Sequence, residues 1–304
     1  MKKVTLVTVN FNSEDETHNL LASLKHIHYE NFSLSIVVVD NGSKIPFELS
    51  IEEKKENILL ITTKENLGFA GGYNVGMRYG LDNGAEYVVV LNNDTIVEKN
   101  CIEEMLRACE SEKKCGIVVP KIYFAKNHEF HKDRYSDAEK GKVFWFAGGY
   151  MDWANIFSRH RGVDEVDTGQ YDNTEKVDFA TGCCMCIPRD VLEKVGLFDE
   201  KLFLYFEDAD LSQRVLKAGY TIIYAPKAVI WHTNAASGGG SGSILHDYYI
   251  TRNRMIFGMK YAPLRSKIAL LRESLRLLVF GRKWQKAGIK DFYLGKFGKG
   301  SFGN

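Results

Sequence analysis

Two clusters of acidic and amide side chains carry the strongest chemical signal in this chain. Glu207, Asp208 and Asp210 follow directly on the apolar run 202–206, and an Asn-Asn-Asp run at 92–94 closes an apolar run far earlier. A helix start explains part of the later cluster, because acidic residues favour the first turn of a helix. It does not explain both clusters. Two such clusters at element ends predict one site with an anion-binding metal and a general base.

Asp94 and His232 are the candidate metal ligands. A carboxylate is a hard oxygen ligand that suits Mg²⁺ or Mn²⁺, which use few protein ligands together with substrate phosphates. His232 follows the apolar run 228–231, so we expect it at the end of a strand. Another interpretation stays open for each residue, since a single Asp after a strand also caps helices and a His there is more often structural.

The elements that must position these residues form an α/β pattern. Strands are expected over 4–9, 34–39, 58–62 and 87–91. Helices are expected over 17–26, after the loop 66–74 to about 79, and over about 98–109. This alternation predicts a mostly parallel sheet covered by helices on both faces, with ligands beyond the carboxyl ends of the strands. Four polar residues fall at or just past those ends: Asn10, Asp40, Asn66 and Asp94.

The loop 66–74 is rich in glycine but does not have the dinucleotide-binding spacing. Gly68, Gly71 and Gly72 do not form G-x-G-x-x-G, and no Walker lysine follows them. An ordinary turn is the default interpretation. Its place between a strand and a helix also allows backbone N–H groups to approach an anion.

Composition narrows the class of protein. The 304 residues are 45% hydrophobic and 26% charged with a net charge of +1, which argues against a general nucleic-acid binder. The six cysteines include one C-x-x-C pair, and buried free thiols in a reducing compartment are expected. No signal peptide or run of roughly 20 apolar residues is found. We therefore expect a cytoplasmic protein.

An ordered series of motifs resembles family 2 glycosyltransferases of the GT-A type, in particular the rhamnosyltransferase-like and galactofuranosyltransferase-like subgroup. The resemblance covers about residues 3–257. The matching pieces are Val7-Thr8-Val9-Asn10-Phe11-Asn12, Val38-Val39-Asp40-Asn41-Gly42-Ser43, Asn66 to Asn74, Leu91-Asn92-Asn93-Asp94, Thr181-Gly182, Gly196 to Glu200, and Phe206 to Leu211.

The resemblance implies a nucleoside diphosphate sugar donor, with dTDP- or UDP-sugars expected, and an inverting transfer to a glycan or lipid-linked glycan in cell-surface polysaccharide assembly. It implies roles for individual residues. Thr8 and Asn10 line the nucleotide pocket, Asp40 contacts the base, and the donor is also held by Asn66, Gly68, Asn74, Asn92 and Asn93. Asp94 and His232 bind Mg²⁺ or Mn²⁺, Asp208 is the general base, and Glu207 supports or contacts the acceptor.

The chain departs from the family pattern at one position. The first acid of the DxD-like motif is Asn92 here. That change puts the strength of metal binding in doubt, and Arg252 is then a candidate to supply positive charge to the donor.

Residues 1–257 are expected to form the GT-A catalytic domain, with a nucleotide-sugar half over 1–115 and an acceptor half over 116–257. Residues 258–304 form a basic helical extension. From Leu264 onward it has ten Lys and Arg against two acids, beside an apolar helical stripe. Two interpretations stay open: a helix on the anionic inner face of the membrane, or a helix packed on the domain. The Gly/Ser-rich segment 237–243 is expected to be a mobile loop that closes over the donor.

Two other functions remain as alternatives. A sugar nucleotidyltransferase also uses a parallel sheet and a metal, but it would need a Gly-rich loop with a basic residue just after the first strand, and residues 10–15 have none. A carbohydrate-binding protein without catalysis would not bind a nucleotide. A hydride-transferring dinucleotide enzyme is disfavoured by the glycine spacing.

Overall fold

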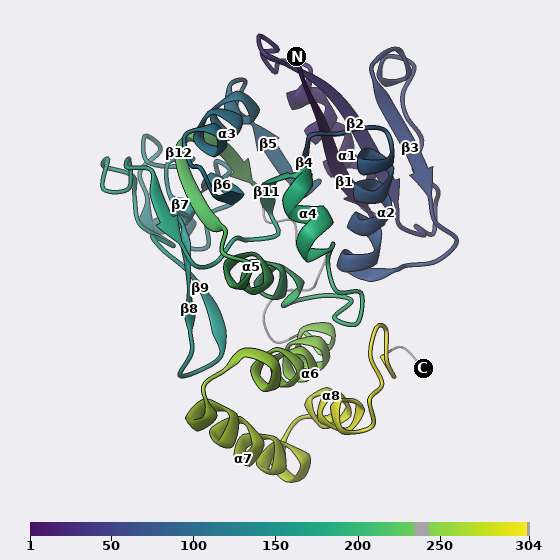
Figure 1. Cartoon of the computed structure of the whole chain (residues 1–304), viewed down its shortest axis with the longest axis vertical. Helices are drawn as coiled ribbons and strands as arrows, with labels where there is room; N and C mark the ends of the chain where they lie inside the picture. The colour runs from purple at the N-terminus through teal and green to yellow at the C-terminus, as the bar shows by residue number, and fades with distance from the viewer. Residues whose placement is uncertain (234–242, 303–304) are drawn as a thin grey trace.

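A large mixed sheet forms the centre of the molecule in a computed structural model, which describes residues 1–233 and 243–302 (Figure 1). The strands lie in the order β10-β12-β6-β11-β4-β1-β2-β3, with β5 beside β12 and β7 beside β6. The expected α/β architecture with a mostly parallel central sheet is confirmed.

The first half of the sheet has the predicted alternation. Its elements are β1 (Lys2–Asn10), α1 (Glu14–Leu24), β2 (Phe32–Asp40), β3 (Ile58–Thr62), α2 (Gly68–Asp82), β4 (Tyr87–Leu91), β5 (Thr95–Val97) and α3 (Cys101–Glu110). Runs of Val, Ile and Leu form these strands because both faces of the sheet are buried by helices.

The second half adds two long strands, several short ones and two helices. Its elements are β6 (Cys115–Phe124), β7 (Phe144–Phe146), β8 (Gly149–Asp152), β9 (Phe157–His160), β10 (Glu175–Val177), β11 (Cys184–Pro188), α4 (Arg189–Val195), α5 (Glu207–Lys217) and β12 (Thr221–His232). β8 and β9 form a separate hairpin.

Strand direction decides where the site lies. β1, β2, β3 and β4 pair in parallel, and β12 pairs in parallel with β6. β11 is antiparallel to both β4 and β6, so β6 and β12 run in the same direction as β4. The carboxyl ends of β1, β2, β4 and β12 therefore meet at one edge of the sheet, where the amino end of β11 also lies.

Glycines bring α2 close to the face of β1. A Cβ at Gly76 would lie 2.3 Å from a methyl group of Val7, and one at Gly80 would lie 2.9 Å from Thr5. Spaced four residues apart, these glycines let the helix backbone approach β1. Part of the glycine signal in this region thus serves helix–sheet packing.

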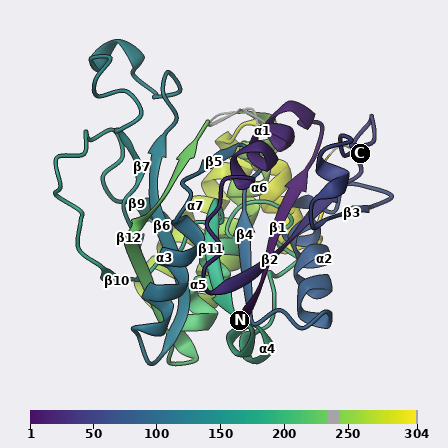
Figure 2. The ribbon, with the colours of Figure 1, turned by 90° about the horizontal axis from the view of Figure 1, so that it is seen from above.

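The helices α6 (Ile244–Tyr261), α7 (Leu264–Phe280) and α8 (Lys283–Tyr293) form a layer beyond α5, on one side of the sheet (Figure 1). Viewed from above, this layer lies behind the strands (Figure 2). α6 continues through the boundary expected at 257/258, so the extension begins within a helix. Among the described residues, none of the helices combines the length and apolar character needed to span a bilayer.

Two further expectations concern cysteine and the glycine-rich loop. All six cysteines are buried and free, as predicted. Most of the segment 237–243, expected to be mobile, lies outside the described residues; only Ser243 is described, as the N-cap of α6.

Candidate functional site

Asp94 and His232 meet at the carboxyl edge of the sheet. His232 pairs with Thr95 in the antiparallel β5–β12 ladder, and this places His232 Nε2 3.1 Å from Asp94 Oδ1. Both side chains are buried, and the other ring nitrogen, Nδ1, has no hydrogen-bond partner among the described residues. The backbone is also joined there, since Thr233 N donates to Asp94 O at 2.9 Å.

This pair fits a divalent cation that completes its coordination with substrate phosphates. A carboxylate oxygen and an imidazole nitrogen already converge on one point, and Mg²⁺ or Mn²⁺ takes only one or two protein ligands in such sites. Within residues 1–233 and 243–302 no group of three or more His, Cys, Asp and Glu side chains is arranged to hold a metal by itself. A metal here would therefore depend on the donor for further ligands.

An aromatic cluster supports the imidazole of His232. The Trp145 ring lies between two histidines, with centroids 4.6 Å from His232 and 4.5 Å from His160. Burial lowers the pKa of His160 to about 4, although its hydrogen bond with Trp145 O acts in the opposite direction. His160 is thus neutral at physiological pH and adds no positive charge beside His232.

A cleft opens over the same edge of the sheet. The residues that line it come from the ends of β1, β2 and β4, from α2 and the loop before it, from the segment before α5, and from the first turn of α6: Val9, Phe11, Ser13, Asn41, Asn66, Gly68, Phe69, Tyr73, Asn92, Asn93, Asp94, Phe203, Leu204 and Leu245. Of the predicted site residues, the structure brings Asn66, Gly68, Asn92, Asn93 and Asp94 together in this cleft.

Asn41 organises the loop that forms one wall. Its Nδ2 donates to Gly68 O at 2.9 Å and its Oδ1 accepts from Leu67 N at 3.0 Å. Asn66 Oδ1 accepts from Gly68 N at 2.8 Å. Gly68 has φ +74°, and a Cβ there would lie 2.4 Å from Phe203 O, so only glycine fits.

Thr8, Asn10 and Asp40 lie behind the cleft wall and do not line it. All three are buried, and Asp40 accepts hydrogen bonds from Asn10 Nδ2 and Phe47 N, both at 3.1 Å. The Thr8 hydroxyl has no partner among the described residues. In this structure the Asp40 carboxylate is used to hold the ends of β1 and β2 together.

Asp208 lies in the first turn of α5 and faces the amino end of β11. Its Oδ2 accepts from Gly182 N at 3.1 Å, and burial raises its pKa to about 6 despite the hydrogen bonds from backbone N–H groups. Gly182 separates it from the cleft, since a Cβ at Gly182 would lie 2.9 Å from the Phe69 ring and 3.5 Å from Asp208 Cβ. A carboxyl with this pKa can act as a base near neutral pH.

Glu207 is a buried carboxyl beside the half-buried Asp208. Its Oε2 has no partner among the described residues. Burial, and then the neighbouring charge of Asp208, raise the pKa of Glu207 well above its ordinary value. Environment therefore separates the two carboxyls, with Glu207 holding its proton and Asp208 losing it more readily. Asp210 pairs with Arg214 at 2.7 Å and does not line the cleft.

Asn74 and Arg252 are not brought to the cleft. Asn74 holds the loop before α5 by accepting from Phe198 N at 3.0 Å and donating to Phe198 O at 2.9 Å. Arg252 is fully buried in α6, between the rings of Tyr248 and Tyr249. Its guanidinium has no route to a donor in this arrangement. The position of Arg252 in the sequence, shortly after the segment expected to be a mobile loop, gave no sign of that burial.

Sequence reasoning did not single out Asn41, Gly182 or Trp145 as site residues. Asn41 and Gly182 stand inside motifs that were recognised, next to Asp40 and Thr181. The recognised residues beside Asn41 and Gly182 were a signal that could have identified both. Trp145 had none, because its contact with His232 spans most of the second half of the chain.

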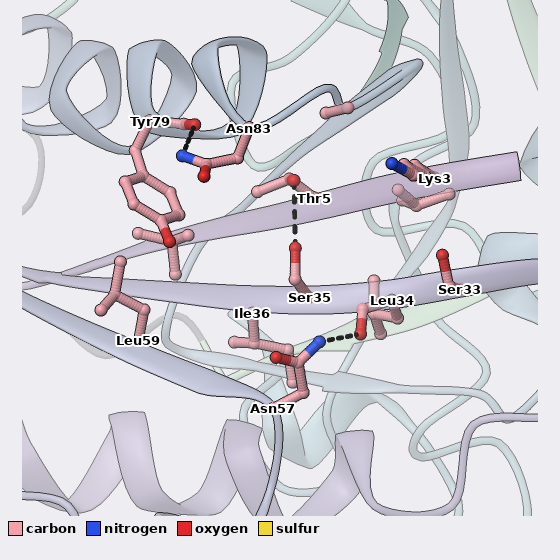
Figure 3. A pocket seen from close by; sticks show the side chains of 13 residues that line it. Lys3, Thr5, Ser33, Leu34, Ser35, Ile36, Asn57, Leu59, Tyr79 and Asn83 are labelled. Atoms are coloured by element: carbon pink, nitrogen blue, oxygen red, sulfur yellow. Dashed lines mark hydrogen bonds between the residues drawn. The ribbon is translucent and has the colours of Figure 1, made fainter.

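A second hollow lies on the face of β1 and β2 near their amino ends, at the far end of these strands from Asn10 and Asp40 (Figure 3). The Thr5 and Ser35 hydroxyls meet in it at 3.1 Å, and Asn57 donates to Leu34 O. No carboxylate lines it. In open α/β sheets ligands bind beyond the carboxyl ends of the strands, so this hollow is not the candidate site.

Comparison with known proteins finds a matching family and related sequences. Residues 2–258 match the model of the family described as glycosyltransferase like family 2. A low-salt glycan biosynthesis hexosyltransferase of Haloferax volcanii is 29% identical over 220 residues, covering 72% of this chain and 63% of that protein. An N-acetylglucosaminyl-diphospho-decaprenol L-rhamnosyltransferase of Mycobacterium tuberculosis is 26% identical over 244 residues, 77% of each chain. The match thus spans less than two thirds of the first relative.

Solved structures share the fold at low identity. GalNAc-T7, crystallised with UDP, GalNAc and Mn²⁺, superimposes with a TM-score of 0.58 at 13% identity, over 89% of this chain and 54% of that one. The mannosyltransferase PcManGT of Pyrobaculum calidifontis, in complex with GDP-Man and Mn²⁺, gives 0.53 at 15% identity, over 96% and 74%. The expected GT-A fold is confirmed.

Proposed function

The chain belongs to the glycosyltransferase-like family 2, and we propose that it transfers a sugar, with inversion, from a nucleoside diphosphate sugar to a hydroxyl of a glycan or lipid-linked glycan. The observation that carries this proposal is the meeting of Asp94 and His232 at the edge of the sheet where Asp208 also lies. Inversion needs a base on one side of the sugar and charge stabilisation of the diphosphate on the other.

Asp94 and His232 would hold Mg²⁺ or Mn²⁺ together with the donor. A cation bound there would supply positive charge to offset the charge that develops on the leaving diphosphate. Asn92 contributes no charge to this site, and the Tyr73 hydroxyl fixes its side chain by donating to Asn92 Oδ1 at 3.1 Å. With one carboxylate and one imidazole, the protein's own affinity for the metal is low and rises with the donor.

Asp208 removes the proton from the attacking hydroxyl. Its Oδ2 accepts from Gly182 N and its Oδ1 from Ala209 N at 2.7 Å, and each oxygen keeps a second lone pair that can accept the proton. Glu207 stays protonated beside it and offers an O–H donor to the acceptor or to Asp208. Asn66, Gly68, Asn92 and Asn93 contact the donor in the cleft, whereas Thr8, Asn10 and Asp40 support the nucleotide from behind the wall.

The relatives narrow the substrate class. Besides the mycobacterial rhamnosyltransferase, a dTDP-rhamnosyl transferase of Shigella flexneri is 25% identical over 229 residues, covering 74% of this chain and 67% of that protein. The names of these two enzymes support a dTDP-sugar as donor and a lipid-linked acceptor. The proposal also includes a UDP-sugar as the other donor, and a role in cell-surface polysaccharide assembly at the cytoplasmic side of the membrane, both on the family resemblance alone. The side chains that line the cleft do not by themselves identify one sugar.

A panel of nucleotide sugars tests the proposal. With Mn²⁺ or Mg²⁺, the correct donor raises the melting temperature by mass action, and saturation at 100 times Kd is worth about 2.7 kcal/mol. Chelator removes most of that shift, and slow hydrolysis or transfer identifies the sugar. Stabilisation by free glycan alone would indicate a binding protein. Pyrophosphate release from a nucleoside triphosphate and a sugar phosphate would indicate a nucleotidyltransferase instead.

Helix α7 supplies the membrane contact in this proposal. Leu264, Ile268, Leu275 and Val279 form an outward stripe, each between 43% and 74% exposed. The helix packs inward on α6 and α8, with Leu270 and Ser274 buried. The two interpretations of the tail thus apply to opposite faces of one helix.

Charge favours an anionic lipid surface as the occupant of that stripe. Arg265, Arg272 and Arg276 are exposed, and helical spacing places them in a second row along α7, next to the apolar stripe. Near an anionic membrane each basic residue contributes about 1 kcal/mol, or roughly fivefold in affinity. Such an arrangement lies in the interface plane, where a lipid-linked acceptor is also found.

Vesicle co-sedimentation tests this surface. Binding should rise with anionic lipid content and fall with salt, and the triple exchange of Arg265, Arg272 and Arg276 to Glu should abolish it. Leu275→Glu should weaken it, whereas Ile45→Glu, at an exposed apolar residue far along the chain, should not. Binding that persists in the triple variant would exclude the α7 face as the docking surface.

A further inference from the structure

The segment 201–206, which delivers Glu207 and Asp208, has an unfavourable backbone. Phe203, Tyr205 and Phe206 have φ values of +63°, +69° and +72°. Bulky residues adopt this left-handed region only when surrounding contacts force them to do so. Phe206 is also the N-cap of α5, so its conformation sets the direction in which the helix, and with it Asp208, leaves the loop.

Asn253 holds this segment by its carbonyl groups. Its Nδ2 donates to Leu202 O at 2.7 Å, Leu204 O at 2.8 Å and Tyr205 O at 2.9 Å. The side chain is fully buried, and its Oδ1 accepts from Arg252 Nε at 3.0 Å, which fixes the orientation of the amide. One amide group thus bonds three carbonyls within the strained stretch.

Arg252 extends the same contact toward the start of the segment. Its Nη2 donates to Lys201 O at 3.3 Å and to Leu202 O at 3.2 Å. Its guanidinium is buried without a carboxylate in hydrogen-bond contact among the described residues, and carbonyl oxygens take most of its donors. A buried cation satisfied in this way is tied to the backbone it bonds, because loss of those carbonyls would leave it unpaired.

The end of the C-terminal extension supplies a third contact. Gly298 N donates to Lys201 O at 2.8 Å, and Arg252 Nη1 lies 3.5 Å from Lys296 O. Asp291 of α8 accepts from Ser301 N at 2.7 Å and from the Tyr248 hydroxyl, which fixes this stretch on α6. The extension is therefore joined to the loop that carries the acids.

We propose that Arg252 and Asn253, which we call the α6 clasp, are positioning residues that hold the strained segment 201–206 and thereby aim Asp208 at the acceptor hydroxyl. This rests on the proposed function, in which Asp208 is the base. The same segment touches the donor side, since Phe203 and Leu204 line the cleft and Phe203 O accepts from Ala70 N of α2. A shift of the segment therefore displaces the base relative to the donor, and a misplacement of about 1 Å costs about a hundredfold in rate.

The decisive variant is Asn253→Ala, with Arg254→Ala as its control on the same helix. Arg254 bonds Asn155 O at 2.9 Å and Glu273 at 2.8 Å and does not touch the segment. We expect kcat to fall about tenfold to a hundredfold in Asn253→Ala, with a smaller change in donor affinity, and to stay near wild type in Arg254→Ala. Asn253→Ser and Arg252→Lys, which keep a donor, should recover part of the loss.

Hydrogen–deuterium exchange separates this idea from the proposed function. In the protein without substrate, Asn253→Ala should speed exchange across residues 199–210 and leave β1 and β4 unchanged. If wild-type protein transfers no sugar from any nucleotide sugar, the proposed function fails, while the exchange still reports on the clasp. Should Asn253→Ala not fold, Asn253→Ser gives the same comparison. Unchanged exchange, or full kcat despite faster exchange, would overturn the proposal.

Discussion

The proposed donor side and the proposed base side of the site are built in different ways. On the donor side, Asn10, Asp40 and the run 92–94 lie at the ends of parallel strands, and Asn10 donates to Asp40 across two neighbouring strand ends. On the base side, Asp208 follows a segment with three left-handed residues, held by α6 and by the C-terminal extension. One side is organised by the sheet and the other by contacts from a separate layer of helices.

This difference bears on the strained backbone before Asp208 and on its raised pKa. At strand ends the sheet already fixes the backbone from which polar side chains extend. A base must be partly desolvated and held in one orientation, and both requirements oppose stability. The proposed base therefore depends on contacts from α6 and from the C-terminal extension.

The largest expected effect breaks the base side alone. Asp208→Asn keeps the size of the side chain but cannot take the acceptor's proton, so kcat should fall about 10²- to 10⁴-fold. Donor-dependent stabilisation should remain, because the cleft is untouched. Asp190→Asn, at an exposed acid of α4, serves as the control in the same transfer assay. Turnover near wild type in Asp208→Asn would remove Asp208 from the role.

The next effect breaks the donor side alone. Asp94→Ala and His232→Ala each remove one of the two proposed metal ligands. Metal-dependent donor affinity should therefore fall about tenfold to a hundredfold. Calorimetric titration with and without Mn²⁺ measures it. The comparison pair is His18 and Glu53, which are 2.9 Å apart but outside the cleft. If His18→Ala weakens donor binding equally, the loss in the site variants is a general effect on folding.

The pH dependence sharpens the contrast. Burial raises the pKa of Asp208 to about 6, and only the ionised form is a base, so kcat should rise about tenfold per pH unit up to roughly pH 6 and then level off. The control is donor binding measured over the same range, which should not follow this limb. A limb near pH 4 would show that Asp208 is solvated in the working enzyme.

The same pKa shift has a consequence for stability. The folded pKa lies above the ordinary value of 3.8 for an Asp, so the folded state binds the Asp208 proton more tightly than the unfolded state does. The resulting stabilisation is present below about pH 4 and is lost as the pH rises through about 6. Asp208→Asn should therefore be more stable than wild type at pH 7.5, by about 1 kcal/mol, and the difference should vanish in acid. Thermal melts at both pH values measure it.

The smallest effect concerns the buried hydroxyl behind the donor cleft. Thr8→Val replaces an unpaired hydroxyl by a methyl group and should raise the free energy of unfolding by about 1 kcal/mol. Thr5→Val, on the same strand, removes a hydroxyl that bonds Ser35 at 3.1 Å and should lower it. Equal destabilisation by both changes would mean that the Thr8 hydroxyl has a partner in solution. Weaker donor binding in Thr8→Val alone would assign that hydroxyl to the nucleotide.

Much of the donor side could be predicted from the sequence. The strands 58–62 and 87–91 have the predicted bounds, and β12 ends at His232 as expected. These elements are encoded locally, by β-branched apolar runs that end in polar residues. The placement of Asp94 beyond a carboxyl end followed directly, because in a parallel sheet these ends lie together.

The contacts made by Asn74 and Arg252 could not be predicted in the same way. Both were expected at the donor, and the structure places one against Phe198 and the other within the layer of α6 and α8. A polar residue in a recognised motif can bond the ligand or hold the loop beside it. Residue type is the same in both cases, so only packing distinguishes them.

The sequence by itself determined the α/β class, the strand ends that carry polar groups and the acids that can do chemistry, because periodicity and local turn signals are properties of short stretches. The tertiary structure decided which of those groups meet. Asp94 gains His232 only through the β5–β12 pairing, and Asn253 reaches the left-handed segment before Asp208, some fifty residues earlier in the chain, only through the docking of α6. Such contacts depend on strand pairing and helix docking over long separations, which local patterns do not encode.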